Sequence, residues 1–271
     1  MATSNPALRS SVFSRPVDAP RWDELAAPKA GTMTVRGTAI KAGFFLAICV
    51  STAVFTWMKF APGLESGNPG AIGPWLIGAG LGGFVLSLVI SFAPRTAPFV
   101  GPVYAATQGV FIALLSMLMA MQLGGKSEGK VVIDTGMVFQ AASLTFGIAA
   151  AALLLYATGV IRLSQTAMKI VTVAIGGVAI YALGMMLFNG VFKMNLPNLW
   201  VSASPLGIGF SLFVIGLASF SLVMDYQAID TGVRTGQPKY MEWYGAFALT
   251  VTLVWLYIEI LRLLSKLNRR D

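Results

Sequence analysis

The sequence lacks histidine altogether and contains a single cysteine, Cys49, among its 271 residues. The absence of histidine excludes His-dependent catalysis, histidine proton relays and nearly all zinc chemistry. One cysteine cannot form an intramolecular disulfide, and Cys49 lies in an apolar stretch typical of a packed side chain. Charged residues make up only 11% of the chain, against about 25% in a typical soluble domain. A water-soluble globule is therefore excluded.

Apolar residues are abundant instead, at 56% of the chain, and the mean hydropathy is +0.75. They form seven separate segments, each near the ~20 residues that a helix needs to cross about 30 Å of hydrocarbon. The segments are too long and too unalternating for the ~10-residue strands of a membrane barrel. The sequence therefore predicts an all-α polytopic membrane protein with seven transmembrane helices. The predicted spans cover about 40–61, 73–93, 99–122, 135–157, 169–191, 205–226 and 240–264.

The ends and links of the chain differ from the spans in composition. Residues 1–38 are polar and lack an apolar core of signal-peptide length, which predicts a flexible cytoplasmic tail and an uncleaved first helix. The transmembrane domain is then expected over 39–267, followed by a basic end at 268–271. The Pro-Arg-Thr-Ala-Pro link at 94–98 predicts a tight antiparallel hairpin. The glycine-rich stretch at 124–134 predicts a polar loop outside the membrane.

Basic residues indicate the orientation, because positively charged loops stay on the cytoplasmic side. The net charge of +8 is ascribed to topology and lipid headgroups, since no basic cluster with interleaved aromatics indicates nucleic acid. The side of the N-terminus holds eleven basic residues against four on the other side, so we expect a cytoplasmic N-terminus. The C-terminal segment adds four more basic residues. These lie on the opposite side unless the last helix bends back or one segment does not span.

Three acidic residues lie within or at the edges of the last two apolar segments: Asp225, Glu242 and Glu259. An ionised carboxylate at the bilayer centre costs about 2.5–3.5 kcal/mol on insertion scales, so such groups face the bundle interior and usually mark an ion or proton path. A buried pair of acids can change its shared proton near neutral pH. These acids are therefore candidates for a pH-sensitive gate.

Each candidate also has a structural interpretation. Asp225 can lie in the headgroup zone at the end of its helix, and Glu242 can occupy a helix N-terminus, where acids are favourable. Glu259 has Arg262 three residues later, which allows a local ion pair. Arg95 is the lone charge of its hairpin and is expected on the same cytoplasmic level as Asp225. It is either a latch on that acid or a positive-inside anchor.

The end of the sixth span reads Asp225-Tyr226-Gln227, and the last reads PKYMEWYGAFALTVTLVWLYIEILRLLSKL. With SNPAL and MTVRGTAIKAG near the start, the whole chain resembles a bacterial branch of the Bax inhibitor-1/YccA family. The resemblance implies a non-enzymatic stress-response protein of the bacterial inner membrane, with the last of seven helices central and wrapped by the other six. Some members are pH-sensitive calcium leak channels, closed by a pair of acids between helices six and seven and latched by an arginine. Others modulate a membrane-bound protease.

Carried onto this chain, the resemblance implies that Asp225 is the first acid and Arg95 the latch. Glu259 matches the second acid by its Leu-Tyr-x-acid pattern. Other alignments of the last helix place Thr252 or Trp255 at that position. The resemblance therefore gives Asp225 as the first acid, with Glu259 as its acidic partner in one alignment and no acidic partner in the others.

The remaining expectations concern secondary sites, ligands and partners. Secondary candidates for the gate are Glu242, Asp230 and Gln227. The one ligand expected is a calcium ion held by Asp225 and Glu259, and no other cofactor is expected. The expected partners are the lipid bilayer and a membrane protease or another membrane protein. No GxSxG, HExxH or Gly-x-Gly-Asp signature occurs, so we expect no enzymatic activity.

Overall fold

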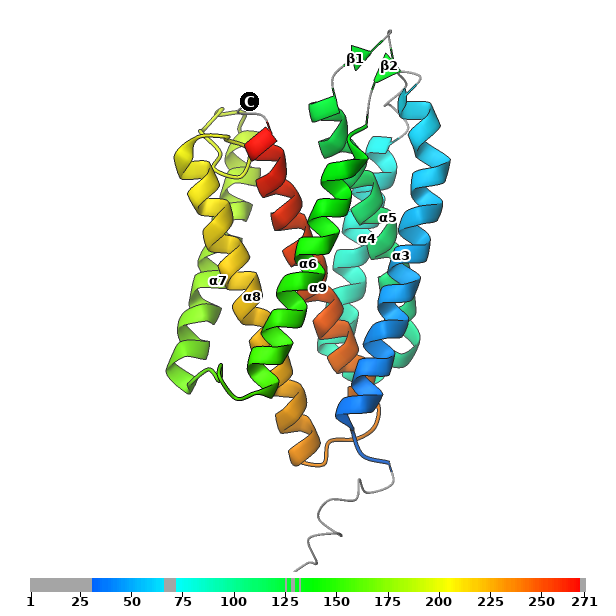
Figure 1. Cartoon of the computed structure of the whole chain (residues 1–271), viewed down its shortest axis with the longest axis vertical. Coiled ribbons are helices and arrows are strands. Elements are labelled where there is room, and N and C mark those ends of the chain that lie inside the picture. Colours follow the sequence, from blue (N-terminus) through cyan, green and yellow to red (C-terminus); the bar gives the residue numbers. More distant parts are fainter. Residues whose placement is uncertain (1–30, 66–71, 125, 128–129, 132, 269–271) are drawn as a thin grey trace, which may run out of the picture.

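The structure, a computed structural model, describes residues 31–65, 72–124, 126–127, 130–131 and 133–268. These residues form seven helices that are long and apolar enough to cross a membrane, which confirms the predicted fold class (Figure 1). The helices are α3 (Val35–Glu65), α4 (Ile72–Phe92), α5 (Ala97–Gly124), α6 (Thr135–Ala157), α7 (Gln165–Met185), α8 (Pro205–Arg234) and α9 (Met241–Asn268). Shorter elements are the 3-10 turn η3 (Pro94–Thr96), the π-helical turn η4 (Met186–Val191) and the strands β1 (Lys126–Ser127) and β2 (Lys130–Val131).

Local sequence signals explain where several helices begin. Asp134, Ser164 and Ser204 each accept a hydrogen bond from a backbone N–H in the first turn of α6, α7 and α8. Such caps satisfy amides that have no partner within the helix. The helices also extend beyond the apolar spans, because backbone hydrogen bonding does not stop at the hydrocarbon boundary: α3 already begins at Val35 and α8 continues to Arg234.

The predicted end segments lie mostly outside the described residues. Residues 1–30 of the expected tail and 269–271 of the expected basic end are not described. The part of the tail at 35–38 is helical and belongs to α3. The link at 94–98 forms η3 and leads directly into α5, which packs against α4 as the expected hairpin predicts.

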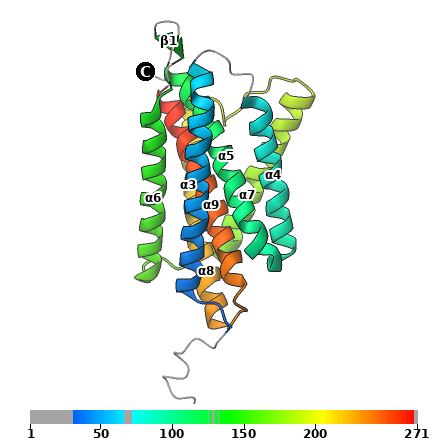
Figure 2. The same cartoon turned by 90° about the vertical axis from the view of Figure 1, so that its right-hand side faces the viewer.

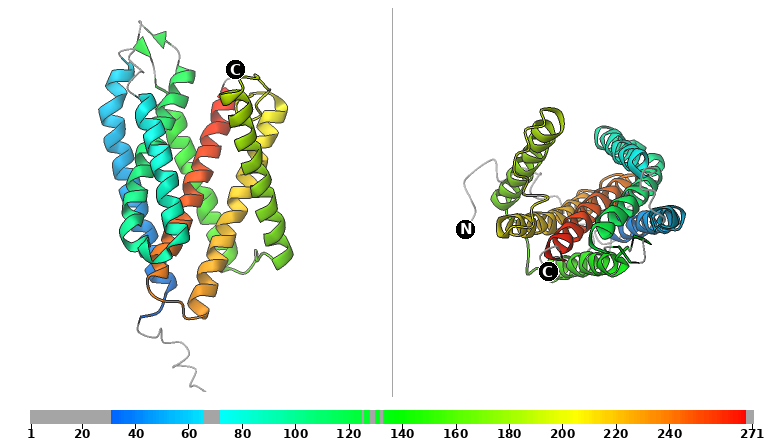
Figure 3. Two further views of the ribbon diagram at one scale, coloured as in Figure 1. Left: turned by 180° about the vertical axis from the view of Figure 1, so that it is seen from behind. Right: turned by 90° about the horizontal axis from the view of Figure 1, so that it is seen from above.

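Helix α9 occupies the centre of the bundle, as expected. Viewed from above, it runs between α8 on one side and α3 and α5 on the other, with α6 beside it (Figure 3). A larger share of α9 is buried than of any other described span. Helix α4 packs mainly against α5, and α7 mainly against α8. Side chains of α9 therefore decide most of the contacts in the interior.

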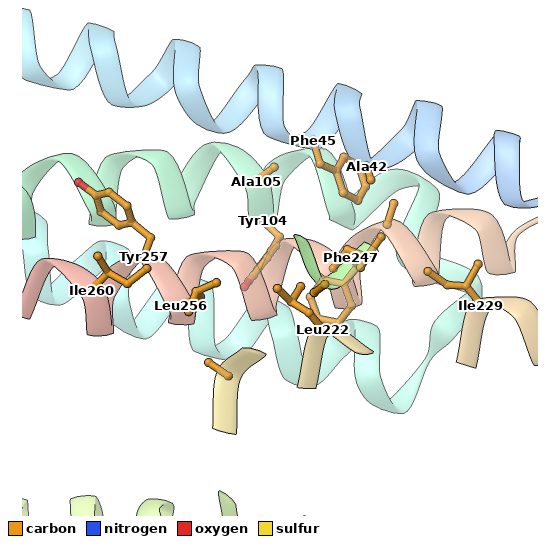
Figure 4. Close-up of a cluster of buried hydrophobic side chains, with 14 of the residues drawn as sticks. Ala42, Phe45, Tyr104, Ala105, Leu222, Ile229, Phe247, Leu256, Tyr257 and Ile260 are labelled. Carbon is orange, nitrogen blue, oxygen red and sulfur yellow. The ribbon is translucent and has the colours of Figure 1, made fainter. Parts of the chain in front are cut away.

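The main hydrophobic core joins α3, α4, α5, α6, α8 and α9, and Figure 4 shows its part between α3, α5, α8 and α9. Phe45, Leu222 and Leu256 are fully buried in it. Tyr104 of α5 and Phe247 of α9 meet edge to face, with ring centroids 4.9 Å apart, a favourable arrangement for aromatic pairs. The core fixes α9 against its neighbours and so sets the register of the polar side chains on it.

The two ends of the bundle are held by different contacts. We call the end where α3 and α9 begin the N-terminal end and the opposite end the C-terminal end (Figure 2). At the N-terminal end, Thr32 forms an isolated β-bridge with Pro238, and Met33 N donates to Gln237 O at 2.7 Å. At the C-terminal end, α9 finishes beside the chain that leads into α8 (Figure 1).

Candidate functional site

Asp225 lies on α8, half-buried, and faces α9. The hydroxyl of Thr252 donates to its Oδ2 at 2.6 Å. This distance is typical of a hydroxyl that donates to a carboxylate. The structure thus places Thr252 against Asp225, as in an alignment that leaves Asp225 without an acidic partner.

The contacts of Asp225 belong to a row of polar side chains between two helices. Thr252, Glu259 and Lys266 follow one another at intervals of seven residues, which places them on one face of α9. Asp225 meets that face at Thr252, and Ser211 meets it at Lys266. We call these five residues the α8–α9 seam. They are spread over about half the length of both helices. The seam contains Asp225 and Glu259, two of the three acids noted in the last two apolar segments.

Glu259 is 2% exposed and pairs with Arg262 of the same helix. Thr252 and Glu259 are separated by about 10 Å of helix, because each residue advances the helix by 1.5 Å. The described contacts therefore give Asp225 and Glu259 separate partners and do not join them as a pair. The buried Oε2 of Glu259 has no hydrogen-bond partner among the described residues.

Arg95 lies in η3 and is exposed. It makes no ion pair with any described residue. No described hydrogen bond or ion pair joins Arg95 to Asp225, so the latch stays a prediction and the anchor interpretation stays open.

Glu242 forms a buried contact between the first and last helices. It is 1% exposed and pairs with Lys41 of α3 through Oε2. Its Oε1 accepts hydrogen bonds from the backbone N–H and the hydroxyl of Thr34, at 3.0 and 2.8 Å. A Cβ at Gly37 would overlap the carboxylate, so this glycine leaves room for it. Glu242 does lie in the first turn of α9, but its main role is to bind α3.

Gln227 and Asp230 hold the end of α8 to the end of α6 and to the segment that follows it. The side chain of Gln227 donates to Leu163 O at 3.0 Å and accepts from Leu163 N at 3.2 Å. Asp230 pairs with Arg234 at 3.1 Å and accepts from the Tyr156 hydroxyl at 3.0 Å. Both secondary candidates therefore have structural partners away from Asp225.

Lys41 and Lys266 are buried or nearly buried basic residues that sequence reasoning assigned only to topology. Lys266 is 2% exposed, and Lys41 is 16% exposed in its side chain. The signal for Lys266 was its spacing of seven residues from Glu259 on an amphipathic helix. The partner of Lys41, in contrast, is 201 residues away and follows no local pattern.

An apolar cavity of about 390 Å³ lies between α3, α5, α6 and α9. Among the side chains that line it are Cys49, Trp57, Phe139 and Tyr257. The hydroxyls of Ser116 and Tyr257 hydrogen-bond to each other at 2.7 Å in its wall. Cys49 is buried there as a small side chain, which agrees with its expected packing role.

Replacing Tyr257 by phenylalanine is expected to lower the free energy of unfolding by about 1 kcal/mol, the typical net value of one hydrogen bond. Chemical unfolding in detergent micelles measures this change. Tyr244→Phe is the control, because the Tyr244 hydroxyl makes no hydrogen bond with the described residues. Equal stability of the two variants would show that the Ser116 contact contributes nothing.

The described residues contain no group of three or more acidic or cysteine side chains close enough to hold one metal ion. Asp225 and Thr252 supply two neighbouring oxygen-bearing groups, and Glu259 is bound to Arg262. Calcium takes six to eight oxygen ligands. A calcium ion at Asp225 would therefore need water for most of its coordination.

Seven apolar helices in the described part of the chain, with α9 at the centre of the bundle, define an integral membrane protein of the polytopic helical class. A family model described as Bax inhibitor 1 like matches residues 5–269. The chain therefore belongs to this family. Searches of curated proteins and of solved structures found no match.

Proposed function

We propose that the protein is a pH-sensitive leak channel for cations, chiefly calcium, and that the α8–α9 seam opens and closes it. The Asp225 contact supports this most directly. Asp225 is a half-buried carboxyl within a membrane span whose hydrogen-bond partner is a hydroxyl and not a basic side chain. A carboxyl of this kind changes the local charge by a full unit when it takes up a proton.

The proton changes the strength of the contact between the two helices. An ionised Asp225 accepts a charge-assisted hydrogen bond from Thr252, which is about twice as strong as a neutral one. Protonation converts it to a neutral contact and weakens the hold of α8 on α9. The seam is therefore closed when Asp225 is ionised and loosens as the pH falls.

Titratable groups on the helices around Asp225 have partners of their own. These contacts are Glu242 with Lys41, Glu259 with Arg262, Tyr257 with Ser116, Tyr156 with Asp230, Lys266 with Ser211, and Tyr226 with the carbonyl of Ala149. Lys169 of α7 is exposed. Asp225 can therefore take up a proton without breaking a neighbouring ion pair.

We also propose a bacterial inner membrane location with the N-terminus in the cytoplasm, and neither an enzymatic role nor a resident cofactor. Exposed basic residues at the N-terminal end of the bundle support this orientation, because positive charge stays on the cytoplasmic side. They are Arg36, Arg95, Arg162, Lys169 and Lys239.

The test is calcium flux into liposomes that contain the purified protein, measured between pH 8 and pH 6. Wild-type flux is expected to rise as the pH falls. Asp225→Asn, which imitates the neutral carboxyl, is expected to give the same flux at every pH, close to the wild-type level at pH 6. Thr252→Val removes the hydroxyl donor and is expected to raise flux at pH 8.

Asp230→Asn is the matched control. It removes an acid from the same helix, five residues further on and outside the seam, and is expected to keep the wild-type pH profile. Identical profiles for wild type and Asp225→Asn would refute the proposal, as would the absence of flux from all of the proteins.

A second candidate function is that of a non-conducting partner of a membrane protease or other membrane protein. The outer side of α7 favours it, because this helix packs mainly against α8. Four apolar side chains on that side are each 64–75% exposed: Ile170, Val173, Ile180 and Leu183. They form a face that lipid or a partner helix can cover. Co-purification of a defined partner from native membranes, without flux in liposomes, would favour this function.

A further inference from the structure

Lys266 lies near the C-terminal end of α9 with only 2% of its surface exposed. Its ammonium group donates to three oxygen atoms: Leu199 O at 2.7 Å, Gly207 O at 2.8 Å and Ser211 Oγ at 2.7 Å. An ammonium has three donors, so this set satisfies all of them. The acceptors come from the first turns of α8 and the chain that precedes it.

All three acceptors are uncharged, which is unusual for a buried lysine. Buried charges are normally paired with an opposite charge, yet Lys266 forms no ion pair with any described residue. Glu259, the nearest acid along α9, stands about 10 Å of helix away and is bound to Arg262. The C-terminal end of the seam therefore carries net positive charge.

Besides its ion pair with Glu259, Arg262 makes a cation–π contact. Its guanidinium lies over the ring of Trp200, 5.3 Å from the ring centroid, and Trp200 is the residue that follows Leu199 in the chain before α8. Both basic side chains thus bind the segment before α8. Lys266 donates to the carbonyl oxygen of Leu199, and Arg262 lies over the ring of Trp200. The positive charge at this end is held in place by the fold.

Two backbone carbonyls and a hydroxyl at 2.7–2.8 Å from one point form the kind of oxygen cage that replaces the water shell of a cation in selective pores. Here the occupant is covalently attached to α9. We propose that Lys266 is a tethered cation that plugs the C-terminal end of the α8–α9 seam. This inference rests on the proposed cation pathway.

The plug opposes cation flow in two ways. Its ammonium group hydrogen-bonds the three oxygen atoms that a passing cation would need as ligands, and its positive charge repels cations at that end of the seam. Removing a unit charge about 10 Å from a permeating monovalent cation at an effective dielectric constant near 20 changes a rate by about tenfold, and the effect on divalent calcium is larger. Lys266→Met keeps the length of the side chain and is expected to raise flux by at least this factor.

The matched control is Lys193→Met. Lys193 is exposed in the segment between η4 and α8, at the same end of the bundle, so the variant loses the same charge but no caged contact. Ser211→Ala removes one of the three acceptors and leaves Lys266 in place. Its flux is expected to lie between those of wild type and Lys266→Met, and it keeps the test valid if Lys266→Met does not fold.

A second measurement does not depend on conduction. Lys266→Ala leaves the cage without its ammonium, so methylammonium is expected to raise the melting temperature of this variant in detergent and to leave that of wild type unchanged. Tetramethylammonium has no N–H donor and is expected to have no effect. Equal responses to the two ions would contradict the cage.

The outcomes separate this inference from the proposed function. Raised flux in Lys266→Met, wild-type flux in Lys193→Met and rescue by methylammonium support the plug. Unchanged flux in Lys266→Met, together with loss of pH dependence in Asp225→Asn, overturns the plug and leaves the proposed function standing. Absence of flux from wild type and all variants, whether or not methylammonium stabilises Lys266→Ala, overturns both the plug and the proposed function.

Discussion

Replacing Lys41 by methionine is expected to lower the free energy of unfolding by about 3–5 kcal/mol, the usual effect of leaving a buried charge without its partner. Glu242 is 1% exposed, so without Lys41 its carboxylate keeps only the two hydrogen bonds from Thr34. Chemical unfolding in detergent micelles measures the loss. The double variant Lys41→Met, Glu242→Gln is expected to lose less than the sum of the two single changes, because no unpaired charge remains.

Asp230→Asn supplies the comparison for an ion pair in contact with water. Arg234, the partner of Asp230, is 68% exposed in its side chain, and exposed pairs contribute at most about 1 kcal/mol. A loss of similar size in Lys41→Met and Asp230→Asn would mean that Glu242 is not held as a buried charge.

Replacing Gly109 by alanine is expected to lower the free energy of unfolding by about 3 kcal/mol, the upper part of the range for overpacking. A Cβ at this position on α5 would overlap Thr52 Oγ1 and the carbonyl oxygen of Cys49, both on α3. A backbone carbonyl cannot rotate away as a side chain does, so the two helices must separate. Small residues that allow such close approach are typical of membrane helix interfaces.

Gly43→Ala is the matched control for this substitution. Gly43 lies on α3, and a Cβ there would meet nothing within 4 Å. This variant is expected to be stabilised by about 0.5–1 kcal/mol, because alanine loses less conformational entropy in a helix. A destabilised Gly43→Ala, or an unaffected Gly109→Ala, would contradict the close packing of α3 and α5.

The apolar segments of the sequence were sufficient for the fold class, and the resemblance to the family implied the central position of the last helix. The hydrocarbon core demands long apolar helices, and this demand is visible as seven separate runs in the chain. The exact ends were less predictable. Helix α8 continues to Arg234 beyond the predicted end at 226, because backbone hydrogen bonds persist after hydropathy falls.

The partners of the charged residues were only partly predictable. The Glu259–Arg262 pair is three residues apart on one helix and was one of the interpretations open from the sequence. The contact of Asp225 with Thr252 depends on the register between α8 and α9. That register is set by core side chains such as Leu222 and Leu256, and no local pattern reveals it.

The contact between Thr34 and Glu242 joins positions 208 residues apart and has a consequence for biogenesis. Membrane helices emerge from the ribosome in order and then associate within the lipid. Lys41 therefore emerges well before its acidic partner Glu242 has been synthesised. A nascent chain truncated ahead of α9 is expected to leave this ammonium to water or lipid headgroups, so the last helix to be made completes the contacts of the first.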